Sequence, residues 1–341
     1  MSFRRFFKAG SRVIVLLLAA ELLLQGYHYF FFSSLFLSRD YLEAKGKPQG
    51  GDFSFRLNKD GFKDIDFSQK TSGRYRIVAV GDSFAFSSVP YEKSFLTLLE
   101  EKLQRGDEQV ELLNMGIPSI GPQDYLSLLY REGLKQKPDM VLLSLFIGDD
   151  FSAAGGKELC DYSALCSLGQ RFIELTRDYP GRTYHGNVNY CDNCPILPKK
   201  VFLAYLAERA YLFDKRDERF GGQLENLLST LKTIRDLCAA ENVRLVVLLL
   251  PSVIQFDREL GDEIRKRKNI DQSEWDLSRP NRSLGAELEH QEITFFDLLP
   301  PLTDQPHPLY KVNDVHWNLN GNQQAADIVS GRLAGLIHPR R

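Results

Sequence analysis

Short apolar segments separated by helical patterns are the feature that most constrains how this chain can fold. Residues 75–80, 110–113 and 138–147 have the length and the nearly unbroken apolar character of strands that are buried on both faces. Between them, residues 92–104 and 123–133 show the spacing of apolar positions that is typical of helices. A chain that alternates strands with helices in this way is expected to form a parallel sheet with right-handed crossovers.

The first strand runs into Gly81-Asp82-Ser83, and a distant segment, Asp314-Val315-His316, supplies the partners that a catalytic serine needs. A serine hydroxyl becomes a nucleophile when an imidazole removes its proton, and a carboxylate must hold the other ring nitrogen. Ser83, His316 and Asp314 are therefore candidate catalytic residues. Glycine at position 81 lets the chain turn sharply off the strand. Ser83 would then lie at a helix N-terminus, which favours developing negative charge.

By itself, Gly-Asp-Ser is more typical of a turn followed by a helix cap. Two further segments favour the catalytic interpretation. Residues 114–116 follow the second strand and residues 148–150 follow the third, and both segments contain glycine and polar side chains. Because the strands are predicted to be parallel, these segments are expected at the same edge of the sheet as Ser83.

Taken in this order, the segments resemble the SGNH, or GDSL-type, hydrolase family over roughly residues 74–336. The segments that are similar to the family's serine, glycine, third and histidine blocks are 81–84, 114–116, 148–150 and 314–321. Their joint order and spacing are far more specific than any single block. The resemblance implies a flavodoxin-like three-layer α/β sandwich with a parallel central sheet.

The resemblance also implies a role for each matching residue. Ser83 would be the nucleophile, His316 the general base and then acid, and Asp314 the carboxylate that orients the ring. The backbone N–H groups of Ser83 and Gly116 would stabilise the oxyanion. The family's third block normally adds an asparagine amide, but the matching residue here is Asp149. An ionised carboxylate would repel the oxyanion, so we expect Asp149 to be protonated, turned away or bound to another group.

The N-terminal region predicts a membrane anchor. Four basic residues lie within residues 1–12, and residues 13–33 form an apolar stretch long enough to cross a lipid bilayer. No convincing cleavage site follows, so we interpret the stretch as an uncleaved signal anchor. The positive-inside rule places residues 1–12 in the cytoplasm and the rest of the chain in the periplasm or outside the cell. The alternative is a buried amphipathic helix of the soluble domain.

The chain after the anchor is predicted to have two parts. Residues 34–73 are polar and contain several glycines, which indicates a stalk that becomes a surface extension. Residues 74–341 would form the SGNH hydrolase-like domain. Within it, residues from about 151 to 211 do not follow the alternation of strands and helices, so they are expected to form an inserted cap over the sheet edge.

The cap region carries four of the five cysteines, namely Cys160, Cys166, Cys191 and Cys194. In an exported domain they favour two disulfides, and Cys160–Cys166 with Cys191–Cys194 is the most economical of the three possible pairings. A four-cysteine zinc site is the rival, because Cys191 and Cys194 have a knuckle-like spacing. The wider spacing of the other pair favours disulfides, so we predict neither a metal nor a cofactor.

The composition argues against one class of function, nucleic-acid binding, and Trp317 is a further candidate residue near the site. With 43 basic and 45 acidic side chains the formal charge is −2, and no basic run indicates nucleic-acid binding. Trp317 follows His316 directly and is expected either to contact substrate or simply to pack beside the site.

These observations predict a membrane-anchored, exported serine esterase that acts on acyl esters, with O-acetyl groups of a glycan as the expected substrate. An O-acyltransferase of an exported polysaccharide is the first alternative, because a sugar hydroxyl can replace water as the acceptor. The second is a scaffold that is catalytically weakened at Asp149 and binds a glycan or proteins of an envelope or polysaccharide assembly. Metal-assisted chemistry by Asp149, Asp150 and Asp314 is the third.

Overall fold

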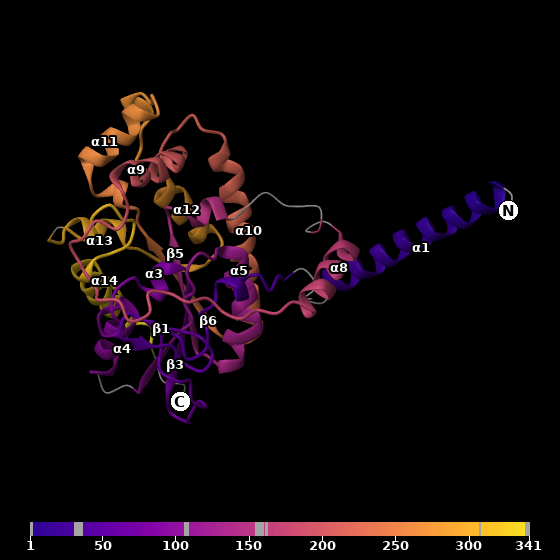
Figure 1. Ribbon diagram of the computed structural model, residues 1–341, viewed down its shortest axis with the longest axis horizontal. Coiled ribbons are helices and arrows are strands. Elements are labelled where there is room, and N and C mark those ends of the chain that lie inside the picture. Colours follow the sequence, from indigo (N-terminus) through magenta and orange to yellow (C-terminus); the bar gives the residue numbers. More distant parts are fainter. Residues whose placement is uncertain are drawn as a thin grey trace. The chain divides into compact units, whose positions relative to one another are not determined.

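The computed structural model of the protein describes residues 3–30, 37–105, 109–153, 160, 163–306 and 308–337 (Figure 1). The chain divides into two compact units. The smaller unit comprises Met1–Arg39 with Gly156–Tyr179, and the larger comprises Asp40–Gly155 with Pro180–Arg341. The larger unit contains the sheet and the candidate site.

The larger unit is built on a five-stranded parallel sheet. Its strands are β3 (Tyr75–Gly81), β4 (Val110–Asn114), β5 (Met140–Phe146), β6 (Arg244–Leu250) and β7 (Thr294–Asp297). Their order across the sheet is β4-β3-β5-β6-β7, and every neighbouring pair is parallel. In chain order this is the 2-1-3-4-5 arrangement of flavodoxin-like proteins. The predicted α/β fold with a parallel central sheet is therefore confirmed.

The helices that flank the sheet form two groups. One group consists of α4 (Phe95–Gln104) and α14 (Leu319–Leu333), which lie side by side (Figure 1). The other consists of α5 (Pro122–Leu128), α10 (Arg219–Ala240) and α12 (Arg279–His290), with α10 in contact with both neighbours. Right-handed crossovers place the helix after β3 on the opposite face from those after β4, β5 and β6. The result is a three-layer sandwich.

The remaining elements of the larger unit connect these layers. They are α2 (Tyr41–Ala44), β1 (Gly51–Asp52), β2 (Phe55–Arg56), α3 (Ser83–Phe86), α6 (Asp150–Ala153), α9 (Lys199–Glu208), α11 (Arg258–Arg267) and α13 (Leu299–Thr303). A π-helical turn, Leu129–Gly133, extends α5. Single 3₁₀ turns lie at Tyr91–Lys93, Leu134–Gln136, Ala210–Leu212, Val253–Gln255 and Gln272–Glu274.

The sheet interior is mostly apolar but contains a buried ion pair. Every residue of β5 is buried, as expected for a central strand of a parallel sheet. Arg76 on β3 is also buried, and its Nε lies 2.8 Å from Oε1 of Glu111 on β4. Its remaining nitrogens donate to the backbone carbonyls of Gln136 and Ser68. This pairing offsets the cost of burying the charge.

Residues 40–73 belong to the same compact unit as the sheet, although their polar sequence suggests a stalk. Lys63 explains part of the difference. Its side chain is 1% exposed, and Nζ lies 2.6 Å from Oδ2 of the equally buried Asp52. The ammonium also donates to the carbonyls of Ser87 and Val89. A buried ion pair leaves no apolar run in the sequence, so this packing could not be predicted from hydrophobic periodicity.

The region from about 151 to 211, which the sequence suggests is one cap, is divided between the two units. Gly156–Tyr179 groups with the N-terminal helix, and the chain from Pro180 onward groups with the sheet. The division depends on contacts between residues far apart in the sequence.

The structure also pairs the cysteines. It joins Cys160 to Cys166 and Cys191 to Cys194, which is the pairing named from the sequence. The fifth cysteine, Cys238, is a buried free thiol on α10. With both pairs engaged in disulfides, the four thiolates of the rival zinc site are not present.

The smaller unit contains α1 (Phe3–Phe30) and α8 (Ala164–Leu175). Within α1, the window Gly10–Tyr27 is long and apolar enough to cross a membrane, and none of it is buried inside the protein. A single helix of this kind is compatible with the predicted anchor over residues 13–33. Residues 31–33 of that span lie outside the described residues.

Candidate active site

Ser83 lies where β3 passes into α3. Asp82 caps the helix by accepting a hydrogen bond from the N–H of Phe84 at 2.8 Å. A Cβ at Gly81 would lie 2.8 Å from the Cβ of Ser144 on β5, which is closer than real Cβ atoms approach. Glycine is therefore required for the strands and the following helix to meet at this point. Ser83 becomes the first residue of α3, at the carboxyl edge of the sheet.

The histidine of the last block reaches Ser83 from the other end of the chain. His316 Nε2 lies 2.8 Å from Ser83 Oγ, and His316 Nδ1 lies 2.8 Å from Asp314 Oδ1. Both contacts are satisfied when Nδ1 donates its proton to the carboxylate and Nε2 accepts from the serine hydroxyl. The structure thus brings together the three residues that the sequence indicates for nucleophilic catalysis.

Asp314 is held as a carboxylate. Burial raises its pKa, but the hydrogen bond and charge of His316, together with the charge of Lys311, outweigh burial and lower the pKa below its ordinary value. The spacing of two residues is sufficient for the carboxylate to reach the ring from the same loop. Asn313, at the spacing seen in many relatives, instead donates to the carbonyl of Leu197.

Trp317 packs beneath the site and does not line it. Its side chain is 2% exposed and contacts the rings of Phe84 and Phe95 edge-on, at centroid distances of 5.1 and 5.6 Å. The expectation that Trp317 contacts substrate is corrected accordingly.

Gly116, which the resemblance implied as an oxyanion donor, has its N–H engaged by a side chain in this structure. The N–H donates to Oδ1 of Asn114 at 2.9 Å. A Cβ at this position would lie 2.3 Å from the backbone nitrogen of Phe86, so glycine allows the loop to pack on α3. Further along the loop, Ser119 adopts a φ of +66°. Among the described residues, its N–H has no hydrogen-bond acceptor.

Asp149 is bound to an arginine and a tyrosine. Its Oδ1 accepts from Nε of Arg209 at 2.7 Å, and its Oδ2 accepts from the hydroxyl of Tyr205 at 2.5 Å. The guanidinium also lies over the Tyr205 ring, 3.4 Å from its centroid. Of the three states expected for Asp149, the structure shows the one in which the carboxylate is bound to other groups and its charge is balanced.

Tyr205 and Arg209 are the candidate functional residues that sequence patterns did not indicate. Tyr205 lies on α9, and Arg209 directly follows the helix. Their spacing of four residues places them on one side of the helix and was visible in the sequence. That spacing is common on helices, however, and nothing in it points to Asp149.

Two further carboxyl groups are buried near one another at this end of the sheet. Burial raises the pKa of Asp82 to about 7, and the charge of Asp149 contributes to the rise. Burial and the charge of Asp82 raise the pKa of Asp150, which accepts from the Tyr125 hydroxyl at 2.8 Å. Asp149, Asp150 and Asp314 therefore have separate partners. The part of the chain that the structure describes contains no cluster of three metal-ligating side chains.

The loop closed by the Cys191–Cys194 disulfide lies against the histidine segment. Asp192 within this loop accepts from the first N–H of α14 at 3.0 Å. A backbone hydrogen bond of 3.1 Å joins Ile196 to Val312. The disulfide loop therefore braces the segment that carries Asp314 and His316.

A groove adjoins the same segment. It encloses about 730 Å³ between α9, α11 and residues 308–313. Phe202, Phe256, Tyr310 and Lys311 are among the residues that line it. The groove thus combines apolar surface with hydrogen-bonding groups beside the loop that carries the histidine.

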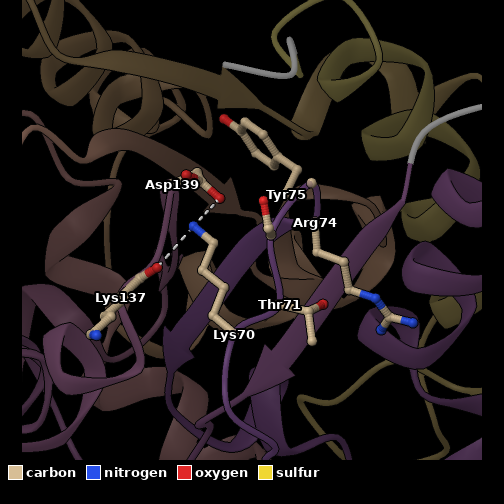
Figure 2. A pocket seen from close by; sticks show the side chains of 8 residues that line it. Lys70, Thr71, Arg74, Tyr75, Lys137 and Asp139 are labelled. Atoms are coloured by element: carbon tan, nitrogen blue, oxygen red, sulfur yellow. Dashed lines mark hydrogen bonds and ion pairs between the residues drawn. The ribbon is translucent and has the colours of Figure 1, made fainter. Parts of the chain in front are cut away.

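A second pocket, of about 310 Å³, is unrelated to the site (Figure 2). Lys70 projects into it and binds Asp139 Oδ2 at 2.5 Å and the Lys137 carbonyl at 3.1 Å. Its lining residues include Tyr75 and Asp139, where β3 begins and just before β5 begins. The pocket is therefore at the amino edge of the sheet, about 20 Å along the strands from Ser83.

Comparison with protein families found a match to a model of SGNH hydrolase-like domains. Residues 208–339 match the family model described as SGNH hydrolase-like domain, acetyltransferase AlgX. The matched range contains Arg209, Asp314 and His316, whereas Ser83 precedes it. No curated protein sequence matches the chain significantly. Residues 208–339 are therefore similar to an SGNH hydrolase-like domain.

Several solved structures align with this chain at low sequence identity. TesA is 12% identical, and the alignment covers 77% of this chain and 99% of that chain with a TM-score of 0.45. A lipase/acylhydrolase from Enterococcus faecalis is 15% identical, with coverage of 78% and 99% and a TM-score of 0.43. A GDSL-like lipase from Bacteroides thetaiotaomicron is 10% identical, with coverage of 77% and 89% and a TM-score of 0.41.

Proposed function

We propose that the protein is an exported serine enzyme that transfers acyl groups through an acyl-serine intermediate on Ser83. The observation that carries the proposal is the pair of 2.8 Å contacts that join His316 to Ser83 Oγ on one side and to Asp314 on the other. A neutral imidazole in this tautomer is a base for the hydroxyl, and the carboxylate stabilises the imidazolium that forms.

The reaction follows from these contacts. Ser83 Oγ attacks the ester carbonyl while His316 Nε2 takes the hydroxyl proton, and the ring then gives that proton to the departing alcohol oxygen. The hydroxyl of the acceptor then loses its proton to His316 and attacks the acyl-serine carbonyl. His316 returns this proton to Ser83 Oγ as the acyl group leaves, which restores the serine. The N–H of Ser83 is our first oxyanion donor, and the unpartnered N–H of Ser119 is our candidate for the second.

The acceptor decides whether the enzyme is an esterase or an O-acyltransferase. Water as acceptor gives an esterase, and a sugar hydroxyl gives an O-acyltransferase. The match to a family described as an acetyltransferase supports acetyl as the acyl group and transfer as the reaction. The groove beside the histidine segment has aromatic and polar lining residues, which suits a glycan.

The proposed location is the outer face of a membrane. Residues 13–33 would cross the bilayer, with residues 1–12 in the cytoplasm and the catalytic unit outside. The apolar window within α1 supports this topology, and so does the presence of two disulfides, because disulfides persist in oxidising compartments. Proteins of envelope or polysaccharide assembly are the partners that this location suggests.

Labelling with a fluorophosphonate tests the activated serine. The native chain and the Ser83→Ala variant are treated in detergent, and the modified peptide is located by mass spectrometry. We expect one adduct at Ser83 in the native chain and none in the variant, because the probe reacts with a serine whose proton an imidazole removes. A folded native protein without an adduct would contradict the proposal and favour a scaffold that binds glycan or partner proteins.

A further inference from the structure

Glu21 is a charged residue inside the apolar window of α1, and its hydrogen bonds join it to the start of α8. Oε1 accepts from the N–H of Ala164 at 2.8 Å, and Oε2 accepts from the N–H of Leu165 at 2.9 Å and the hydroxyl of Ser163 at 3.1 Å. Gln25, one turn further along α1, donates to Oε1 at 2.8 Å. The carboxylate thus satisfies backbone donors that the first turn of a helix leaves unpaired.

This contact lies inside the window that could cross a membrane. Glu21 precedes Tyr27, the last residue of the window, by about 9 Å along the helix axis. A carboxylate at that depth is costly unless it is paired. The start of α8 supplies the pairing, so it must lie at the same depth as Glu21 when α1 spans a bilayer.

Four large apolar side chains are exposed on α8, including Ile173 at 66%. Leu168, Phe172 and Leu175 follow one another at spacings of four and three residues, and their side chains are 46%, 69% and 70% exposed. Ser167 and Glu174, by contrast, are buried. A helix of a water-soluble protein has the opposite arrangement. Small or polar residues in the helix contact and apolar residues outside are typical of helices that face lipid.

The apolar surface continues onto α1, which indicates what covers it. Leu22 and Leu23, next to Glu21, are 73% and 76% exposed. The two helices are in contact, so the environment of this part of α1 is also the environment of the α8 stripe. Arg177 and Tyr179 follow α8, with the guanidinium carbon 5.7 Å from the ring centroid. Such residues are typical of the membrane–water interface.

We propose that α8 lies in the outer leaflet of the bilayer that α1 spans, with its apolar stripe (Leu168, Phe172 and Leu175) against lipid acyl chains. The inference rests on the anchoring by α1 proposed above. The chain passes between the two units after residues 39, 155 and 179. The catalytic unit is therefore tethered to the bilayer by three chain connections, which confines it to substrates near the membrane surface.

Tryptophan fluorescence in the full-length protein tests the contact with lipid. Phe172→Trp adds a reporter to the stripe, Gln170→Trp adds one on the opposite side of α8, and Leu17→Trp adds one to the middle of α1. Each variant is reconstituted in phosphatidylcholine vesicles with and without brominated acyl chains. The native protein, with its two tryptophans, provides the background. We expect strong quenching and emission at shorter wavelength for Phe172→Trp and Leu17→Trp, and weak quenching for Gln170→Trp.

The tryptophan variants test the α1 anchor and the position of α8 separately. Quenching of Leu17→Trp without quenching of Phe172→Trp would overturn the proposal for α8 and leave the α1 anchor in place. Absence of quenching for both would overturn the anchor and, with it, the position of α8. Equal quenching of Phe172→Trp and Gln170→Trp would contradict a stripe that faces lipid on one side.

Discussion

At the scale of single residues, Asp149 replaces the asparagine of the third block, and its carboxylate charge is balanced by neighbouring side chains. The third block of related hydrolases normally offers an asparagine amide here, and a bare carboxylate would oppose the oxyanion. Arg209 and Tyr205 engage both of its oxygens. The arginine side chain is 18% exposed and the aspartate 37%, so the pair is partly accessible to solvent and not deep in the core. We therefore expect the Arg209–Asp149 pair to act mainly by neutralising the negative charge of Asp149.

We expect Arg209→Ala to lower kcat/KM by about 100-fold, because the Asp149 carboxylate would be left without its cation beside the oxyanion. The double variant Asp149→Asn/Arg209→Ala should recover most of the loss, since it carries neither charge and offers an amide. Hydrolysis of an aryl acetate by the native protein, the two single variants and the double variant measures the coupling.

A double variant as slow as Arg209→Ala would contradict this account. It would show that Arg209 acts on the substrate or on α9 and not through the charge of Asp149. Circular dichroism and thermal unfolding of each variant would serve as controls for the fold.

The meeting of Ser83, His316 and Asp314 could be predicted because each lies in a short segment with characteristic neighbours. Ser83 follows a buried strand and glycine, and His316 follows Asp314 by two residues. The oxyanion role of Gly116 stays a prediction. The hydrogen bond from its N–H to the side chain of Asn114 could not be foreseen, because a side-chain conformation is not encoded in a motif. Arg209 could not be predicted, because its partner is brought near only by the fold.

At the scale of elements, two lysines hold the turn that follows α3. Lys63 donates to the carbonyls of Ser87 and Val89, and Lys311 donates to that of Ser88. Ser87 has a φ of +65°, a conformation that costs a side-chain residue free energy. The ammonium groups stabilise the turn, and they connect the segment before β3 and the histidine segment to the helix of the nucleophile.

We expect Lys63→Met to destabilise the protein by about 3–5 kcal/mol, because it leaves the buried Asp52 without its cation. The variant Asp52→Asn/Lys63→Met should lose less, since no uncompensated charge remains. Urea unfolding of the full-length proteins in detergent gives the free energies. Equal losses in the two variants would show that the carbonyl contacts of Lys63, and not its charge, stabilise the turn.

The order of the elements was predictable, but the packing of the chain before them was not. Apolar runs at 75–80, 110–113 and 138–147 correspond closely to β3, β4 and β5, because burial on both faces leaves an unmistakable composition. The segment before β3 is polar and is nevertheless buried in part. It buries the Lys63–Asp52 pair, which periodicity cannot detect, together with apolar side chains such as Leu57 and Phe62.

At the scale of the whole molecule, the two units differ in how far their structure can be predicted from the sequence. The catalytic unit has an apolar interior and a parallel sheet, so its topology follows from the sequence pattern. The smaller unit joins residues 1–39 to residues 156–179, which are far apart in the chain. Glu21 connects them through the backbone of α8, and backbone partners leave no complementary side chain in the sequence. This grouping could therefore not be predicted.

We expect Asp64 to make the stability of the larger unit depend on pH. The carboxyl accepts from the N–H of Asn114 at 2.7 Å and from the Tyr91 hydroxyl at 3.0 Å, yet burial raises its pKa from 3.8 to about 7. The folded state therefore binds this proton more tightly than the unfolded state. Its contribution to stability is fully present below about pH 4 and is lost as the pH rises to about 7.

The variant Asp64→Asn has no proton to lose at this position and isolates the effect. Relative to the native protein, we expect it to gain up to about 4 kcal/mol of stability between about pH 4 and about pH 7, whatever its constant offset from altered hydrogen bonds. Urea unfolding of both proteins across this range measures the difference at each pH. A difference that does not change with pH would mean that the Asp64 carboxyl has the same proton affinity in the folded and unfolded chains. In that case its contacts with Asn114 and Tyr91 must fully offset the cost of burial.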